Sequence, residues 1–272
     1  MTRIAVLQMT AGTDPAVNGA IIEHAAADAA RGGAAMLFTP EMSNVLDRDR
    51  TRAARTIRAP EDDVALRAAR AAARDKGLWI ALGSLAVSHA QSGWANRSML
   101  IRPDGEIAAT YDKLHMFDVD LASGESWRES SAYRAGERAV TAADTPVGRL
   151  GLAICYDMRF PALFEVLGRA GCDTIAIPSA FTVPTGQAHW HVLLRARAIE
   201  ASAFVVAAAQ VGEHEDGRRT YGHSLVADPW GEVLLDMGGD AAGLGFAEID
   251  LARVAEVRAQ LPSLANRRGI AT

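Results

Sequence analysis

Residues 150–169 carry the sequence LGLAICYDMRFPALFEVLGR. The apolar run from Leu150 to Ile154 is typical of a buried strand, and the stretch from Pro161 to Arg169 has the pattern of a helix. Cys155 therefore stands in a sharp turn between a strand and a helix. Backbone N–H groups in such a turn point toward the side chain, so we expect a thiol that ionises more easily than a buried structural one. The position predicts a nucleophile, and a small buried hydrophobe is the alternative.

Length and composition indicate one domain. The chain has 272 residues, 49% of them hydrophobic, with no linker and no internal repeat, so we expect a single α/β domain over residues 1–272. Its 28 basic residues are outnumbered by 33 acidic ones, for a net charge of −5. This balance argues against a nucleic-acid partner.

The sequence also predicts a compartment. No apolar stretch approaches the roughly 18 residues of a membrane span, and the N-terminus runs into strand-like sequence without a secretory signal. We therefore expect a cytoplasmic protein that has no membrane partner. Cys155 and Cys172 are too few for a disulfide framework and should both stay thiols, with Cys172 inert in a buried strand.

The two lysines stand out because the other 26 basic residues are arginine. Lys76 ends a predicted helix, where a cation complements the carbonyl end. No helix end accounts for Lys113, which lies in the stretch from Tyr111 to His115. A compact ammonium can enter a small pocket where a flat guanidinium cannot. Lys113 is therefore a candidate functional residue, with a surface lysine as the alternative.

The periodic segments predict about eleven strands and about five helices. Helices are expected over Pro15–Arg31, Glu61–Lys76, Pro161–Arg169, Ala188–Ser202 and Leu251–Gln260. Strands are expected over Ile4–Met9, Ala35–Phe38, Leu78–Leu85, Asn96–Ile101, Ile107–Tyr111, Gly148–Ile154, Asp173–Ile177, Phe204–Ala209 and Leu244–Ile249, with a further hairpin at Asp228–Gly231. This mixture of βα units and hairpins favours two stacked mixed sheets with helices outside.

Three candidate catalytic residues follow predicted strands. Glu41 comes just after one strand, Lys113 after the second arm of a hairpin, and Cys155 after the run that ends at Ile154. Ligands of α/β folds usually bind at this edge of a sheet. A thiol can attack a carbonyl carbon, a carboxylate can take its proton and return it to a leaving amine, and an ammonium can face the developing oxyanion.

Three stretches carry a resemblance to a known family: Thr39–Met42 (TPEM), Tyr111–Asp118 (YDKLHMFD) and Leu152–Pro161 (LAICYDMRFP). Together they resemble the nitrilase superfamily of carbon–nitrogen hydrolases, over essentially the whole chain. The resemblance implies a four-layer αββα sandwich that pairs into a homodimer or a higher homo-oligomer. It also implies a Glu–Lys–Cys catalytic triad made of Glu41, Lys113 and Cys155.

The resemblance adds two further site residues. Glu129 corresponds to a family glutamate that orients the lysine and lines the pocket, whereas the residue by itself has the pattern of a solvated loop charge. The backbone N–H of Tyr156 would hold the oxyanion together with Lys113. One such donor is worth roughly 3–4 kcal/mol of barrier in other acyl-transfer enzymes. Ala162 departs from the family, which commonly has Glu there.

Four more stretches are most similar to the deaminated glutathione amidase and ω-amidase branch: Pro178–Phe181 (PSAF), Thr185–Trp190 (TGQAHW), Arg195–Glu200 (RARAIE) and Tyr221–Ser224 (YGHS). Arg159 matches a position that some members use to grip a substrate carboxylate, although it could equally pair with Asp157 or a neighbouring helix. Thr185 is a second candidate for substrate contact, with loop packing as its alternative.

The remaining signals predict no cofactor and no metal. His189 and His191 are two residues apart and diverge on a helix, and His214 and His223 are isolated, so we expect structural roles for all four. His115 is expected to pack near the pocket. The chain has no glycine-rich nucleotide-binding pattern.

These patterns lead to one main hypothesis and two alternatives. We expect a cysteine-dependent amidase that acts on the terminal amide of a small carboxylate or 2-oxo acid, such as deaminated glutathione, through a thioester and with release of ammonia. The first alternative is an ω-amidase, or a broader amide or carbamoyl hydrolase of the same superfamily. The second is a catalytically silent binding or scaffold subunit.

Overall fold

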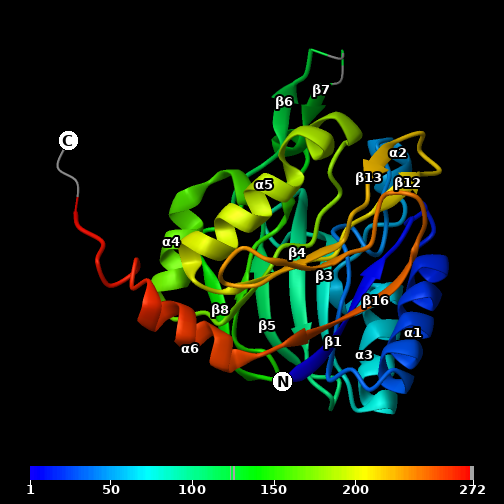
Figure 1. Ribbon diagram of the computed structural model, residues 1–272. Coiled ribbons are helices and arrows are strands. Elements are labelled where there is room, and N and C mark those ends of the chain that lie inside the picture. The colour runs from blue at the N-terminus through cyan, green and yellow to red at the C-terminus, as the bar shows by residue number, and fades with distance from the viewer. Residues whose placement is uncertain (123, 125, 270–272) are drawn as a thin grey trace.

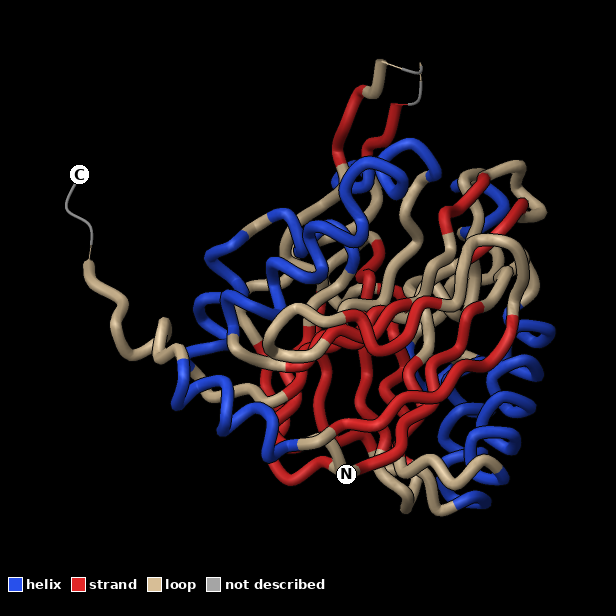
Figure 2. Tube along the Cα trace, viewed as in Figure 1, coloured by secondary structure: helices blue, strands red, loops and turns tan. Residues whose placement is uncertain are grey.

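Two six-stranded mixed sheets form the centre of the molecule (Figures 1 and 2). The computed structural model describes residues 1–122, 124 and 126–269. Sheet 1 has the order β16-β1-β2-β3-β4-β5, with β1 Thr2–Gln8, β2 Met36–Phe38, β3 Trp79–Ser88, β4 Trp94–Ile101, β5 Ile107–Asp112 and β16 Gly243–Ile249. Sheet 2 has the order β15-β14-β11-β10-β9-β8, with β8 Val140–Thr145, β9 Gly148–Leu152, β10 Thr174–Ala176, β11 Phe204–Ala207, β14 Leu225–Ala227 and β15 Val233–Asp236.

Helices cover the outer faces of the two sheets (Figure 1). Helices α1 (Pro15–Arg31) and α3 (Val64–Lys76) pack on sheet 1, and α4 (Pro161–Arg169) and α5 (Val183–Ala201) pack on sheet 2. Two further helices are α2 (Arg50–Ala53) and α6 (Leu251–Gln260). Two short hairpins pair β6 (Asp118–Asp120) with β7 (Ser126–Arg128) and β12 (Val211–Glu213) with β13 (Arg219–Tyr221). The 3₁₀ helices are η1 (Pro60–Asp62), η2 (Glu129–Ser131) and η3 (Cys155–Arg159). This is the predicted αββα sandwich.

The alternation of side chains along β1 explains the layers. Ile4 and Val6 belong to the core that also contains Leu150 and Leu152 of sheet 2. Ala5 and Leu7, which alternate with them along the strand, face the opposite way, into the core beneath α1 and α3. Because successive side chains of a strand point to opposite faces, one apolar strand can serve both cores.

Most element boundaries agree with the sequence prediction, and the differences have local causes. α3 begins at Val64 rather than Glu61, because the Asp63 carboxylate caps it by accepting from the Leu66 N–H at 2.7 Å. α5 begins at Val183 rather than Ala188, since Pro184 suits the first turn of a helix. The described residues form sixteen strands rather than about eleven. Four of the additional strands, β6, β7, β12 and β13, have three residues each, which are too few to show a period. The fifth, β8, has six residues and was missed.

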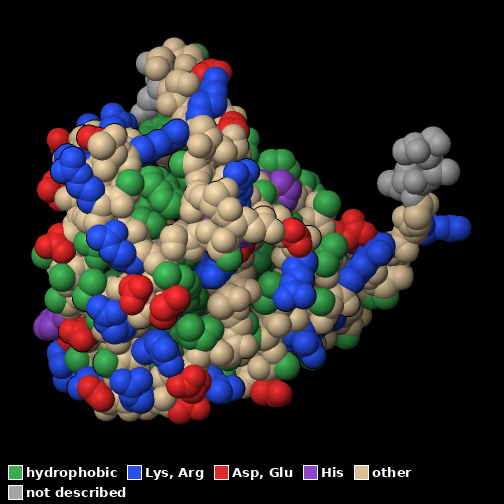
Figure 3. All heavy atoms as spheres, turned by 180° about the vertical axis from the view of Figure 1, so that it is seen from behind, with side chains coloured by type: hydrophobic (Ala, Val, Ile, Leu, Met, Phe, Trp, Pro, Cys, Tyr) green, Lys and Arg blue, Asp and Glu red, His purple; other side chains and the backbone are tan. Residues whose placement is uncertain are grey.

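Basic and acidic side chains are interspersed over the face shown in Figure 3, which carries no extended basic patch. No helix among the described residues is both long enough and apolar enough to cross a bilayer.

Gly83 in β3 holds the segment that leads to Glu41. Its N–H donates to the Thr39 hydroxyl at 2.9 Å, and Ser84 N–H donates to the Pro40 carbonyl at 3.1 Å. A Cβ at position 83 would lie 1.9 Å from the Thr39 carbonyl oxygen and 2.4 Å from that of Pro40. Only glycine allows the two backbones to approach this closely.

We predict that Gly83→Ala lowers the free energy of unfolding by about 3 kcal/mol, because the new methyl group collides with backbone that cannot move freely. Urea denaturation measures the change. The matched control is Gly33→Ala, a glycine with positive φ and open space around it, which should cost only about 1 kcal/mol. Equal losses in the two variants would contradict the close approach at Gly83.

Candidate active site

Glu41, Lys113 and Cys155 line one cavity of about 680 Å³. Glu41 lies in the loop after β2, Lys113 directly follows β5, and Cys155 is the first residue of η3, which follows β9. All three are nearly inaccessible, with 4%, 2% and 8% of their surface exposed. The structure therefore brings the three predicted residues together, from both sheets.

Lys113 joins two carboxylates. Its Nζ lies 2.8 Å from Oε1 of Glu41 and 2.9 Å from Oε2 of Glu129. Only 11% of the Glu129 side chain is exposed, so Glu129 is not the solvated charge that its residue pattern indicated. It lies beside the lysine, where the family resemblance placed it, because the Phe117 N–H donates to Oε2 at 2.7 Å and draws the carboxylate inward. Its catalytic role stays a prediction.

Asn96 is a site residue that the sequence prediction missed. Its side-chain Nδ2 donates to Glu41 Oε1 at 2.9 Å and to Glu129 Oε1 at 3.1 Å, and its backbone carbonyl oxygen accepts from the Lys113 backbone N–H at 3.0 Å. The residue is fully buried in β4. A signal was available, because an amide at a buried position of a central strand needs polar partners.

The environment keeps Glu41 ionised. Burial raises the pKa of this carboxyl, but the Lys113 ammonium and the hydrogen bonds that the carboxylate accepts outweigh burial, so the pKa lies below its ordinary value. One accepted bond comes from the Ala180 N–H at 2.9 Å. For Lys113, burial lowers the pKa, yet the two glutamates raise it well above the ordinary range. The ammonium is therefore permanently charged.

Cys155 is held in a strained turn. Its φ of 46° lies in the left-handed region that non-glycine residues rarely adopt, and its N–H donates to the Pro178 carbonyl at 2.9 Å. Burial raises the pKa of the thiol well above its ordinary value, and the Glu41 carboxylate raises it further against the opposing effect of Lys113. The expectation of an easily ionised thiol is therefore wrong for the resting protein, since the sulfur is shielded from water beside a negative charge.

Asp157 ties the turn at Cys155 to the segment that carries Lys113. Its carboxylate is completely buried and accepts from the Tyr111 hydroxyl at 2.7 Å, the His115 N–H at 3.0 Å and the Ile154 N–H at 2.9 Å. His115 Nδ1 also lies 2.7 Å from it, and the imidazole stacks on Phe160 with ring centroids 3.7 Å apart. His115 thus packs near the pocket, as predicted.

The three predicted substrate contacts, Tyr156, Arg159 and Thr185, also line the cavity. The sequence left two structural alternatives open for Arg159, and its side chain contacts a neighbouring helix, α5, rather than Asp157. Its guanidinium lies 5.3 Å from the centre of the Phe181 ring and 3.3 Å from Nδ1 of His189. The roles of Tyr156, Arg159 and Thr185 in binding substrate stay predictions.

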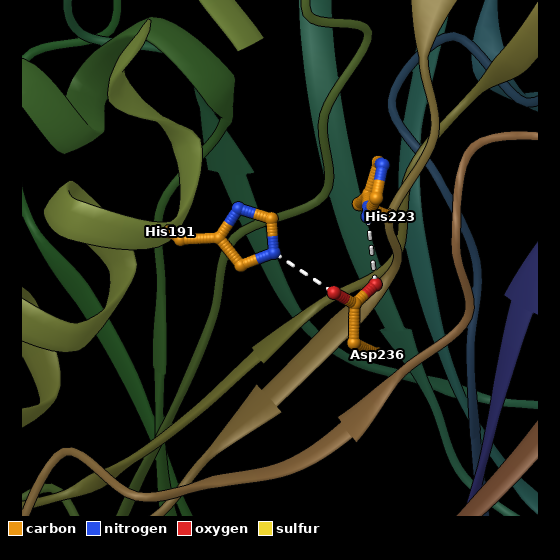
Figure 4. A group of neighbouring side chains, drawn as sticks. All are labelled: His191, His223 and Asp236. Atoms are coloured by element: carbon orange, nitrogen blue, oxygen red, sulfur yellow. Dashed lines mark hydrogen bonds and ion pairs between the residues drawn. The ribbon is translucent and has the colours of Figure 1, made fainter. Parts of the chain in front are cut away.

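One grouping of histidines differs from the prediction. His223 is not isolated, because its Nδ1 lies 2.9 Å from Asp236 Oδ1, while Nε2 of His191 lies 2.8 Å from Oδ2 (Figure 4). Sequence could not show this, since three separate elements contribute. Imidazole and carboxylate side chains are common metal ligands, and the potential ligand atoms of these three residues lie within 4.8 Å of one another. Hydrogen bonds already pair the facing atoms, and none of the three lines the catalytic cavity.

Comparison with known proteins identifies the family. The family model for carbon–nitrogen hydrolases matches residues 3–259. The chain belongs to the carbon–nitrogen hydrolase family. Deaminated glutathione amidase of Bos taurus is 40% identical over 271 residues, which cover 97% of this chain and 81% of that protein. The corresponding human protein is 38% identical over 271 residues, covering 97% and 82%.

Solved structures agree with this family. The NitFhit protein of Caenorhabditis elegans superposes with a TM-score of 0.90 at 37% identity, over 98% of this chain and 65% of that longer chain. An amidase from Nesterenkonia sp. AN1 superposes with a TM-score of 0.81 at 25% identity, over 98% and 94%. In that structure the acetamide moiety of fluoroacetamide is covalently added at the active-site cysteine.

A carbon–nitrogen hydrolase cleaves carbon–nitrogen bonds other than peptide bonds. The side chains of the cavity include the groups that the cleavage of an amide requires. An ionised Glu41 can take the proton of a neutral thiol as sulfur attacks, so base and nucleophile start in the protonation states that the reaction needs. The Lys113 ammonium supplies a fixed positive charge for an oxyanion in a site shielded from water.

We predict a flat pH profile of kcat/KM between about pH 5 and about pH 8, because the pKa of Glu41 lies below its ordinary range and that of Cys155 lies above it.

Asn96→Leu removes a hydrogen bond that lowers the pKa of Glu41, so the fall of kcat/KM on the acid side of the profile should move to higher pH. Initial rates across the pH range measure both. Ser98→Ala on the same strand is the control and should leave the acid side unmoved, whereas an unmoved acid side in Asn96→Leu would contradict this account.

Proposed function

We propose that this protein is an amidase for small carboxylate or 2-oxo acid amides of the deaminated glutathione type. The observation that carries the proposal is the contact of Lys113 with both Glu41 and Glu129 in the cavity that Cys155 and Arg159 also line. The names of the Bos taurus and human relatives support the choice of substrate. Arg159 would hold the substrate carboxylate with its planar guanidinium, and Thr185 would assist it.

The proposed reaction runs in two halves. Glu41 takes the proton from Cys155 Sγ as sulfur attacks the amide carbon, and the oxyanion is held by Lys113 Nζ and the Tyr156 N–H. The tetrahedral intermediate then collapses as protonated Glu41 delivers the proton to the departing nitrogen, which leaves a thioester. Water, deprotonated by Glu41, attacks the thioester carbon. The C–S bond then breaks, the carboxylic acid product leaves, and Glu41 returns the proton to sulfur.

The leaving group depends on the substrate. A primary amide such as 2-oxoglutaramate releases ammonia. Deaminated glutathione is an N-substituted amide and releases its amine component, so the ammonia release expected from the sequence is wrong for that substrate. The ω-amidase alternative differs from the main proposal in this preference, and a broader amide or carbamoyl hydrolase differs in the acyl groups that it accepts. Specificity constants for the two substrates, measured in parallel, separate them.

We predict that Cys155→Ala lowers kcat by at least about 10⁴-fold, because the covalent route is lost. Mass spectrometry of wild-type protein quenched during turnover should show an acyl adduct on Cys155. Cys172→Ala is the matched control, since Cys172 is buried outside the cavity and should be dispensable for turnover. Undiminished turnover in Cys155→Ala would refute the mechanism, whereas a wild-type protein that hydrolyses no small amide would favour the catalytically silent binding subunit.

We further predict that Lys113→Arg is nearly as damaging as Lys113→Ala, with kcat reduced at least about 100-fold, because a guanidinium keeps the charge but cannot occupy the compact position between the two glutamates. Steady-state kinetics on a 2-oxo acid amide measure the loss. Arg50→Lys is the control. It exchanges one type of cation for the other at a different residue of the cavity wall and should leave kcat nearly unchanged. Near wild-type activity in Lys113→Arg would reduce Lys113 to a structural residue.

We also propose a single catalytic domain over residues 1–272, a cytoplasmic location and a homodimer or higher homo-oligomer. The outer faces of α4 and α5 support the oligomer, because they expose Val166, Val192 and Ile199 by 51%, 68% and 43%. Light scattering of Val192→Glu against wild type tests the assembly. An unchanged mass in the variant would remove this helix from the interface.

A further inference from the structure

Two arginines of the cavity lie against Trp127, whereas Arg159 lies against Tyr156 and Phe181. The guanidinium of Arg218 lies 4.5 Å from the centre of the Trp127 ring, and that of Arg48 lies 5.5 Å from it. All three side chains line the cavity. Arg48 precedes α2, Trp127 lies in β7, and Arg218 lies in the turn between β12 and β13, so three separate segments form this wall.

Within the described residues, the guanidinium of Arg218 is largely buried but has no carboxylate within hydrogen-bond distance. Only 17% of its side chain is exposed, and the carboxylate oxygen of Asp216 is 3.6 Å away, too far for a hydrogen bond. Asp216 is engaged elsewhere, accepting from the Arg48 N–H at 2.8 Å and the Arg218 N–H at 2.9 Å. Within the described part of the chain, the buried Nε of Arg218 and the buried Nε1 of Trp127 have no acceptor. Unpaired buried donors are costly, so this wall is arranged for an acceptor.

The other cations of the cavity differ in this respect. Lys113 is neutralised by its two glutamates, Arg128 pairs with Asp120 at 2.7 Å, and Arg50 donates to the Arg128 carbonyl at 2.5 Å. Among the described residues, the side chains of Arg48 and Arg218 make no hydrogen bond to another protein group, since only the backbone N–H of each residue donates. A charge that the fold does not use is available to a ligand.

We propose that Arg218 and Arg48 bind a carboxylate carried by the departing amine of the substrate, with Trp127 beneath it, while Arg159 binds the carboxylate of the acyl part. This inference rests on the proposed amidase function and makes the preferred substrate an N-substituted amide with an anionic group at each end. The guanidinium fork matches a carboxylate geometrically.

The assignment of the two ends follows from the neighbours of each arginine. Arg159 belongs to η3, the element that begins with the nucleophile, and lies against Tyr156 and Phe181. Burial lowers the pKa of Arg218, while the nearby carboxylates of Asp216 and then Glu41 act to raise it; Arg218 and Glu41 line the same cavity. Glu41 is the group that delivers a proton to the departing nitrogen, so Arg218 lies on the amine side.

The chemistry of the substrates agrees with this arrangement. Deaminated glutathione carries a 2-oxo acid on its acyl side and a dipeptide ending in a glycine carboxylate on its amine side. A cavity of about 680 Å³ has room for both parts, within the range of sites that hold drug-sized ligands. 2-Oxoglutaramate has only the first carboxylate and would leave the wall of Arg48 and Arg218 unused.

Three substrates test the inference: deaminated glutathione, its analogue with the glycine carboxylate converted to an amide, and 2-oxoglutaramate. We expect Arg218→Met to lower kcat/KM for deaminated glutathione at least about 30-fold, chiefly through KM, because a desolvated charge contact is lost. For the other two substrates the change should be less than about 3-fold. Arg48→Met should act with the same selectivity.

The matched control is Arg50→Met, which removes a guanidinium from the same cavity and should affect all three substrates by the same factor. A uniform effect of Arg218→Met, or no preference of the wild-type protein for the free carboxylate over its amide, would overturn the subsite and leave the amidase function intact. If the wild-type protein hydrolyses none of the three, the proposed function and this inference fail together.

Discussion

The buried ammonium of Lys113 is the charge on which this site depends. Two carboxylates cannot be kept out of water so close together unless a cation neutralises much of their repulsion, because each buried ion costs several kcal/mol in lost hydration. Lys113 contacts both Glu41 and Glu129, and the Asn96 amide hydrogen-bonds to both as well. The set leaves one net negative charge beside the thiol, which explains why sulfur keeps its proton until a carbonyl arrives.

The two sheets must hold a fixed relation for this set to face the nucleophile. Lys113 extends from sheet 1 and Cys155 from sheet 2, and the Asp157 carboxylate spans them through Tyr111 and His115 on one side and Ile154 on the other. Because Asp157 is fully buried and its partners are mostly backbone or rigid rings, the spacing has little freedom. The positive φ at Cys155 then persists because its surroundings leave no alternative.

How far a sequence predicts such a molecule depends on how local each signal is. α1, α4 and α6 were predicted to the residue, since Asp14, Pro161 and Asp250 are start signals that act within one turn. The three principal site residues follow strands, and sheet edges are a reliable place to look. By contrast, the roles of Asn96 and of the pair His191 and His223 depend on which strands and loops become neighbours. The prediction of an easily ionised Cys155 thiol was wrong for the same reason, because the burial that raises its pKa is a property of the whole fold.

A thiol with a raised pKa has a consequence for durability. Peroxides and alkylating metabolites react with thiolates, and the first oxidation step to a sulfenic acid proceeds slowly when sulfur carries a proton. Between encounters with substrate, Cys155 is therefore shielded chemically as well as sterically. An enzyme built in this way can survive oxidative stress that would inactivate a cysteine held permanently as an anion.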